Sequence, residues 1–185
     1  MSFAHGHANS YANSLQQLPG VTLAAIYDDN AERGQKMAER YGVPFAADTT
    51  TFFNAELNAV IICSENAKHR PMVEAAAGKV GYILCEKPIA STAADGQAII
   101  DICAQTNTKL QIAFPVRFSP PIQWLKTKLA SGELGKVYAV QTTNHGSMPG
   151  GWFIDKALAG GGAVIDHTVH VIDLLRWFWG TEVTE

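Results

Sequence analysis

The sequence predicts an α/β protein, a doubly wound parallel sheet followed by the beginning of a second domain. Short apolar runs alternate with longer amphipathic segments along the first 115 residues. The short runs are apolar at nearly every position, which suits strands that helices cover on both faces. Glycine follows two of the amphipathic segments, and glycine just past a helix supplies the left-handed residue that ends it.

The first part of the chain is expected to contain four strands, at 21–27, 59–63, 82–85 and 109–113. Helices are expected between them, at 30–41, 71–77 and 92–106. The first two helices end before Gly42 and Gly78, and Thr92 with Asp95 forms a weak capping box at the start of the third. No apolar run precedes residues 5–7, where such a sheet would place its first strand. The chain is therefore expected to be incomplete at its beginning.

Prolines at positions 115, 120 and 121 interrupt this rhythm, and they predict a domain boundary between residues 1–115 and 116–185. The second part is expected to hold a helix at 121–130, a strand at 136–143, a loop at 146–151 and a helix at 163–179. The last helix has a strongly apolar face that needs partners to bury it. One strand cannot supply them, so the remainder of this domain is expected to lie outside the chain.

The composition excludes several classes of protein. The chain has 185 residues, is 47% hydrophobic and carries a net charge of -3, with its basic residues scattered. Nucleic acid is not an expected partner, because phosphate binding needs a concentrated basic surface. No apolar run is long enough for a membrane span, and the first residues lack the layout of a secretory signal. Three widely spaced cysteines are expected to be reduced and buried, and the protein is expected to be cytoplasmic.

A dinucleotide site is predicted near the N-terminus. Such a site needs a tight turn of small residues before a helix and an acidic residue at the end of the second strand. Ala4 and Gly6 lie in the turn region, although the full G-x-G-x-x-G pattern is absent, and Asp28 follows the run 21–27. An acid there favours NAD over NADP, and Arg33 could soften that preference. The alternative is that Asp28 is an ordinary loop carboxylate beside Asp29.

Glu86-Lys87-Pro88 follows a predicted strand at its carboxyl end, the edge where α/β sheets bind ligands. A lysine there can exchange a proton near neutrality when burial lowers its pKa. The alternative for Lys87 is a solvated lysine in a turn.

A second group of candidate residues comes from three glycines, at 160–162, followed by Asp166 and His170. On a helix, residues four apart share a face, so the carboxylate is expected to orient the imidazole as a base. His167 is expected to point elsewhere. Two alternatives are a metal site of Asp166, His167 and His170, and a capped helix start with a hydrogen-bonded histidine.

Several segments together resemble the glucose–fructose oxidoreductase/inositol dehydrogenase/rhizopine-catabolism (Gfo/Idh/MocA) oxidoreductase family. In chain order they are Leu18-Pro19-Gly20-Val21 leading to Asp28, Ile61-Ile62-Cys63-Ser64 with Asn66 and His69, Cys85-Glu86-Lys87-Pro88-Ile89-Ala90, Arg117-Phe118, Gly132-x-x-Gly135, Trp152-x-x-Asp155, and the glycine triplet with Asp166 and His170. The resemblance covers nearly the whole chain. It implies a Rossmann domain, an open-sheet α/β domain, and reversible oxidation of a sugar, polyol or related compound with NAD or NADP.

The resemblance also implies roles for individual residues. Lys87 would contact the reacting oxygen, Asp166 would hold substrate hydroxyls, and His170 would be the principal acid and base. Arg117 would lie near the substrate or the nicotinamide. The residues that would line the cofactor are Ser64, Asn66, His69, Glu86 and Pro88, the last after a cis peptide bond.

The loop 144–151 and Trp152 are expected to shape the substrate pocket, and the full-length parent is plausibly a homo-oligomer. His167 stands where the family often has glycine. No metal is expected. The main alternative function is a non-catalytic nucleotide-binding or sensing protein derived from the family, and a metal-dependent hydrolase or isomerase is a more distant one.

Overall fold

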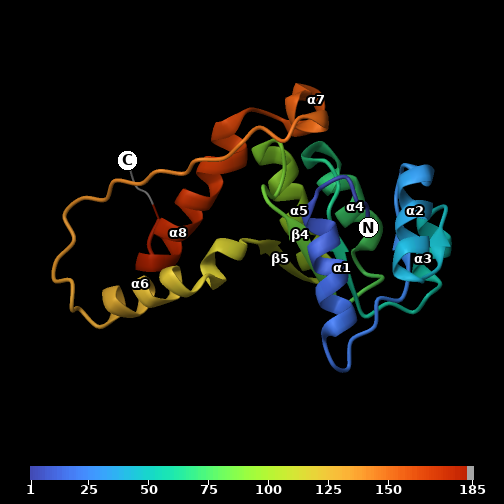
Figure 1. Cartoon of the computed structure of the whole chain (residues 1–185), viewed down its shortest axis with the longest axis horizontal. Coiled ribbons are helices and arrows are strands. Elements are labelled where there is room, and N and C mark those ends of the chain that lie inside the picture. The colour runs from blue at the N-terminus through green and yellow to red at the C-terminus, as the bar shows by residue number, and fades with distance from the viewer. Residues whose placement is uncertain (183–185) are drawn as a thin grey trace.

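The computed structural model describes residues 1–182, and its strands form two parallel sheets (Figure 1). The first sheet pairs β1 (Ile26–Tyr27) with β2 (Phe45–Ala46). The second has the order β3-β4-β5, with bounds Ala59–Ile62, Tyr82–Glu86 and Lys109–Ala113. The parallel α/β class is thus confirmed, and three of the four predicted strands lie within one residue of their expected bounds.

Residues 1–5 join the two sheets. The Met1 amino group donates to the Ile61 carbonyl at 2.7 Å, and the Ser2 amide donates to the Tyr27 carbonyl at 2.7 Å. The Cys63 amide donates back to the Met1 carbonyl at 2.9 Å. These bonds place the start of the chain between β1 and β3, the position of the central first strand of a doubly wound sheet.

The predicted strand 21–27 is paired only at its last two residues. The chain begins opposite Ile61, so the extended residues that follow Met1 run beside residues 26–28. No residue of this segment is left to pair with residues 21–25. A cavity of about 500 Å³ lies between residues 20–26 and 56–61. A strand needs a neighbour to satisfy its backbone groups, which explains why the apolar run alone did not form one here.

Five helices cover the sheets: α1 (His7–Gln17), α2 (Ala31–Tyr41), α3 (Thr49–Phe53), α4 (His69–Ala76) and α5 (Ala93–Gln105). Local sequence explains several of their ends. The Thr92 hydroxyl accepts from the Asp95 amide, as the weak capping box predicted, and Gly42 ends α2 in the left-handed conformation with φ of 67°. Helix α1 was not predicted, because its buried stripe consists of alanines, Ala8 and Ala12.

The main core lies between β3, β4 and the helices α4 and α5. Ile62, Ile83 and Ile99 are almost fully buried there, together with Val73. The cysteines at 63, 85 and 103 are free and buried, as expected. This core fixes the carboxyl ends of β3 and β4, where the candidate site lies.

The chain after residue 114 forms an arm that extends away from the sheets (Figure 1). It contains α6 (Pro120–Ala130), α7 (Lys156–Ala159), a π-helical turn (Val164–Thr168) and α8 (Val169–Trp179). The predicted strand 136–143 is wrong: residues 133–149 are irregular and exposed, and no strand of the described residues pairs with them. The predicted helix 163–179 is divided by the π-helical turn at its start.

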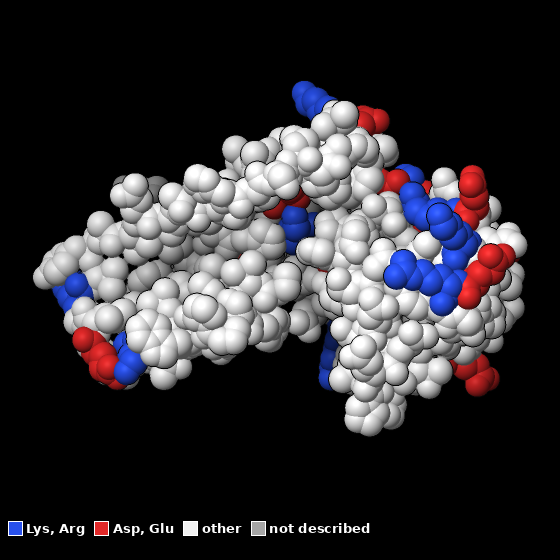
Figure 2. All heavy atoms as spheres, in the orientation of Figure 1, with Lys and Arg blue, Asp and Glu red and all other residues white. Residues whose placement is uncertain are grey.

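The surface of the arm is poor in charge. On the face drawn in Figure 2, charged side chains gather over α2, at α7, at the tip of the arm and in the hollow between the arm and the sheets, while most of the length of the arm is uncharged. Among the described residues no helix is both long and apolar enough to cross a membrane.

Candidate active site

The carboxyl end of β4 buries two charged residues. Glu86 is fully buried and Lys87 is 5% exposed, and the Lys87–Pro88 peptide bond is cis. Lys87 is therefore not a solvated turn lysine, the alternative that its short motif left open. A buried ammonium needs a partner, because the desolvation of an unpaired charge is costly.

That partner is Asp166, which comes from the arm. The Lys87 Nζ lies 2.5 Å from Asp166 Oδ1 and donates to the Asp166 carbonyl at 3.0 Å. Both side chains are largely shielded from solvent, at 6% and 18% exposed. Removing one partner of such a pair typically costs about 3–5 kcal/mol, so this contact joins the arm firmly to the sheet.

The glycine triplet and the π-helical turn determine where Asp166 points. Gly160 ends α7 with φ of 78°, and a Cβ added there would clash with Ser91. The turn 164–168 has a wider period than an α-helix, which rotates residue 166 away from the α-helical face of residue 170. The carboxylate of Asp166 bonds Lys87 and does not bond His170, so the expected Asp166–His170 pairing is wrong.

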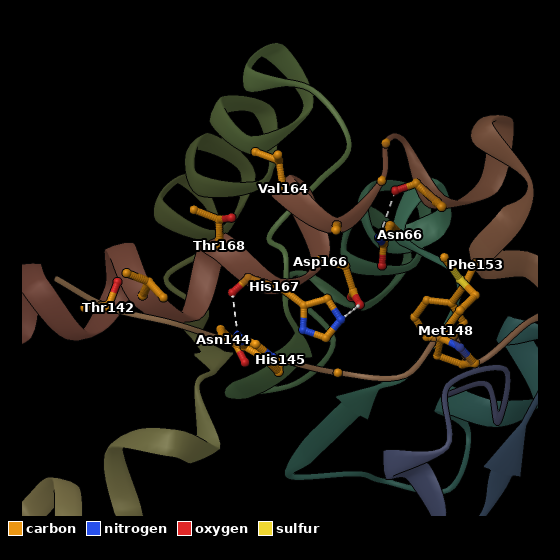
Figure 3. A pocket seen from close by; sticks show the side chains of 17 residues that line it. Asn66, Thr142, Asn144, His145, Met148, Phe153, Val164, Asp166, His167 and Thr168 are labelled. Carbon is orange, nitrogen blue, oxygen red and sulfur yellow. Dashed lines mark hydrogen bonds and ion pairs between the residues drawn. The ribbon is translucent and has the colours of Figure 1, made fainter.

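His167 also lies differently from its prediction. Its Nε2 is 3.5 Å from Asp166 Oδ2, and its ring faces the same cavity as that carboxylate (Figure 3). A Cβ on Gly146 would overlap the ring, so glycine at that position leaves space for the imidazole. The sequence placed His167 outside the site, and the structure places it on the wall of the cavity.

His170 packs against Phe114 in an edge-on arrangement, with ring centroids 6.2 Å apart. Burial and the charge of Lys87 lower the pKa of His170. Within the described part of the chain its buried Nδ1 has no hydrogen-bond partner. The imidazole is therefore neutral at neutral pH and keeps an unused polar atom.

The cavity beside Asp166 has a volume of about 630 Å³ (Figure 3). Its wall is rich in polar side chains that can donate or accept hydrogen bonds: Asn66, Thr142, Asn144, His145, Asp166, His167 and Thr168. Met148 and Phe153 add an apolar edge. A pocket of this size and lining suits a small polyhydroxylated compound.

Of the residues predicted to act on the substrate, Asp166 lines this cavity. Lys87 reaches it only through its contact with Asp166, and His170 lines a separate cavity of about 540 Å³ between α6 and α8. Trp152 and Arg117 also lie outside it.

Trp152 donates from Nε1 to the Ala4 carbonyl at 3.0 Å and stacks on Phe153, and Phe153 is the one that lines the cavity. Arg117 forms a two-point ion pair with Asp173 of α8, with Nε 2.7 Å from Oδ2. Their roles toward ligand stay predictions, and their contacts hold the arm in place.

The N-terminal turn has features that a pyrophosphate needs. Residues 1–5 lead directly into α1, so the positive end of the helix dipole is at the carboxyl edge of the sheet. Gly6 is exposed, and no atom lies within 4 Å of the place where a Cβ would stand. A phosphate group can therefore approach this backbone closely, and the turn fits the dinucleotide that the sequence predicted.

Asp28 is at the end of β1, but its carboxylate is already saturated. It accepts from Arg33 Nε at 2.8 Å and Nη2 at 2.6 Å, and from the amides of Phe3 and Asn30 at 2.7 and 2.9 Å. Four donors fill the four acceptor positions of a carboxylate. A ribose hydroxyl can bind Asp28 only after Arg33, whose side chain is 28% exposed, moves aside.

The loop after β3 buries three polar residues that the resemblance assigned to the cofactor. Ser64 is fully buried, and Asn66 donates to the Ala159 carbonyl at 2.9 Å. His69 Nδ1 donates to the Pro88 carbonyl at 2.8 Å. Asn66 thus connects the loop to α7, and His69 supports the segment that carries Lys87. Cofactor contacts of these residues stay predictions.

Sequence reasoning missed the partners of Glu86. His7 Nδ1 lies 2.9 Å from its Oε1, and the Tyr11 hydroxyl donates to the same oxygen at 2.8 Å. Burial acts to raise the pKa of Glu86, but these hydrogen bonds outweigh it and hold the pKa below its usual value. Burial, together with the charge of the same carboxylate, raises the pKa of Tyr11. The only signal in the sequence is the pair of histidines around Gly6.

Comparison with known proteins decides the family. A family model described as an oxidoreductase family with an NAD-binding Rossmann fold matches residues 2–114, and the model of the Gfo/Idh/MocA C-terminal domain matches residues 122–185. The chain belongs to the Gfo/Idh/MocA oxidoreductase family. The resemblance read from the motifs is confirmed.

Curated relatives include the myo-inositol 2-dehydrogenase of Thermotoga maritima, 28% identical over 95% of this chain and 52% of the relative. The D-xylose 1-dehydrogenase (NADP(+)) 2 of Haloferax volcanii is 33% identical over 85% of this chain and 50% of its own. Among solved structures, the aldose–aldose oxidoreductase of Caulobacter crescentus, complexed with glycerol, is 26% identical with a TM-score of 0.79, over 95% of this chain and 55% of its own. The chain thus spans about half the length of the relatives it matches.

Proposed function

We propose that the protein is an NAD(P)-dependent oxidoreductase that transfers hydride between a nicotinamide and a hydroxyl-bearing carbon of a sugar, polyol or related compound. The observation that carries the proposal is the contact between Lys87 and Asp166. It joins a buried ammonium at the carboxyl end of β4 to Asp166, which lines the polar cavity. Relatives named as sugar and inositol dehydrogenases support the same chemistry.

The protein's own residues would handle the proton. Lys87 would bind the reacting oxygen and polarise it, while Asp166 holds the ammonium in position and binds substrate hydroxyls. His170, neutral because burial lowers its pKa, would take the hydroxyl proton. The bound nicotinamide supplies the acceptor for the hydride that leaves the carbinol carbon.

The substrate class rests on the lining of the cavity. Amide, hydroxyl, imidazole and carboxylate groups surround about 630 Å³, and each can bond a substrate hydroxyl. A site that pairs its polar groups with substrate hydroxyls rejects compounds that lack them, because its own groups would be left unpaired. We therefore propose a polyhydroxylated substrate.

For the cofactor we propose NAD or NADP, with NAD favoured. The turn at Ala4 and Gly6 would bind the pyrophosphate, and Asp28 would bind the ribose. The preference is moderated because Arg33 neutralises Asp28 and could instead meet a 2′-phosphate. The division into residues 1–115 and 116–185, and a homo-oligomeric full-length parent, are parts of the same proposal.

The test begins with a titration of NADH, followed by its fluorescence. Saturable binding and reduction of NAD by at least one member of a panel of inositols and aldoses would support the proposal. Saturable binding with no turnover across the panel would favour a nucleotide-binding or sensing protein. The absence of binding would refute the nucleotide site.

A further inference from the structure

His5, His7 and Glu86 form a cluster beside the N-terminus of α1. His7 Nδ1 and Glu86 Oε1 are 2.9 Å apart, and the His5 and His7 rings meet edge-on with centroids 4.4 Å apart. Each residue offers one ligand atom, and these atoms all lie within 4.8 Å of one another. Among the described residues this is the one group of at least three such side chains with that spacing.

We propose that His5, His7 and Glu86 bind a divalent transition-metal ion, with zinc as the best fit. Two imidazoles and one carboxylate are a donor set that zinc accepts in a tetrahedral arrangement with the fourth position open. Ligand atoms at about 2.0–2.2 Å from one ion lie roughly 3.5 Å apart, so His7 Nδ1 and Glu86 Oε1 must separate slightly and the more distant ligand atoms must approach. The side chain of His7 is 44% exposed and has room to make that movement.

The contacts within the cluster suit a cation. His7 Nδ1 and the fully buried Glu86 carboxylate share one proton across 2.9 Å. The ion would replace the proton that His7 Nδ1 shares with Glu86, as metal binding ordinarily releases protons from its ligands.

The ligands are already held by other contacts. The Tyr11 hydroxyl and the Lys87 amide donate to the two oxygens of Glu86, at 2.8 and 3.2 Å. The His5 Nδ1 accepts the amide of His7 at 3.1 Å, so that bond must yield if Nδ1 is the ligand atom. Such outer contacts orient metal ligands and strengthen binding.

Two nearby positive charges oppose a cation here. The helix dipole of α1 disfavours a cation only weakly, and its effect is small beside the free energy with which ligands of this kind bind zinc. The ammonium of Lys87 is neutralised by Asp166. The buried carboxylate of Glu86 therefore dominates the local field at the cluster.

The experiment is a titration of the whole chain with Co²⁺, followed by its visible absorbance, with Zn²⁺ as competitor. We expect one equivalent of Co²⁺ to bind with a tetrahedral spectrum that one equivalent of Zn²⁺ abolishes. His7→Gln should weaken binding at least about tenfold, the lower end for changes that only disturb metal ligands indirectly. His145→Gln, which changes an exposed histidine outside the cluster, is the matched control and should bind as the wild type does.

Far-UV circular dichroism would establish that each variant is folded. Tyr11→Phe, which removes a contact to Glu86 and no ligand, should weaken Co²⁺ binding less than His7→Gln does. The inference would be overturned by the absence of a stoichiometric cobalt spectrum in the wild type. Equal affinity of the wild type and a folded His7→Gln variant would overturn it as well. Neither readout depends on dinucleotide binding or turnover, so this inference can fail while the proposed function stands.

Discussion

The two parts of the molecule bury their apolar side chains very differently. Residues 1–114 contain two packed clusters, and the isoleucines at 62, 83 and 99 are at most 1% exposed. Among the described residues of the arm, Ala159 and Asp173 are buried, while Phe118, Trp124 and Tyr138 are among many exposed ones. The first part holds itself together through its core, whereas the arm is attached through the Lys87–Asp166 ion pair and hydrogen bonds such as those of Asn66 and Trp152. The comparison teaches that the stability of this chain resides in one part and its candidate chemistry at the junction of both.

The largest expected effect is on turnover, through the contact that joins the two parts. Lys87→Ala removes the group proposed to bind the reacting oxygen and leaves the Asp166 carboxylate unpaired. General acid–base groups contribute about 10²–10⁴-fold, so kcat should fall by that factor while NADH binding persists. Steady-state kinetics and an NADH titration measure both quantities. Lys136→Ala, at an exposed site in the arm, is the control; wild-type turnover in Lys87→Ala would exclude the proposed role.

The second prediction measures the difference in packing directly. Ile83→Ala deletes a side chain that is 1% exposed on the central strand β4, and such a change costs about 2–5 kcal/mol. Trp124→Ala removes a larger side chain that is 60% exposed on α6, and should cost less than about 1 kcal/mol. Urea unfolding of both variants gives the two free energies. Similar losses would mean that the arm is packed as firmly as the sheet.

The sequence predicted the first part of the molecule better than it predicted the arm. Strand β5 and the capped start of α5 were placed correctly, because each depends on local pattern and a buried sheet. Helix α1 was missed because alanines form its buried stripe. In the arm, the strand 136–143 failed because a strand requires a partner that the pattern cannot supply.

The sequence identified the residues of the candidate site better than it identified the contacts between them. Lys87 and Asp166 were both predicted as site residues. Their pairing, between residues 79 positions apart in the sequence, depends on the π-helical turn, which no local sequence pattern predicted. His7 and Tyr11 were missed for a similar reason. Their contact with Glu86 exists only once α1 is packed beside the end of β4.

A smaller effect is expected on cofactor preference, which belongs to the first part alone. Arg33→Ala releases the Asp28 carboxylate, which can then accept from a ribose hydroxyl and repel a 2′-phosphate. The ratio of NADH to NADPH affinity should rise about tenfold, equivalent to about 1.4 kcal/mol. Fluorescence titrations with both nucleotides measure it. Arg40→Ala on the same helix should leave the ratio as it is, and an unchanged ratio in Arg33→Ala would show that Asp28 does not discriminate.

The smallest effect concerns His69, which is fully buried beneath the junction and donates to the Pro88 carbonyl. Burial lowers its pKa, while the carbonyl bond and the charge of Glu86 act to raise it. A histidine held neutral in the folded state takes up a proton more readily in the unfolded state, so its contribution to stability is complete above pH 6.5. That contribution is lost as the pH falls from 6.5 toward the lowered pKa.

The unfolding midpoint should therefore decline below pH 6.5. The midpoint of His69→Gln, which keeps a donor but cannot take up a proton, should decline less. His145→Gln should follow the wild type, and a His69→Gln curve parallel to the wild type would place the acid sensitivity elsewhere, in the carboxylates that also protonate at low pH.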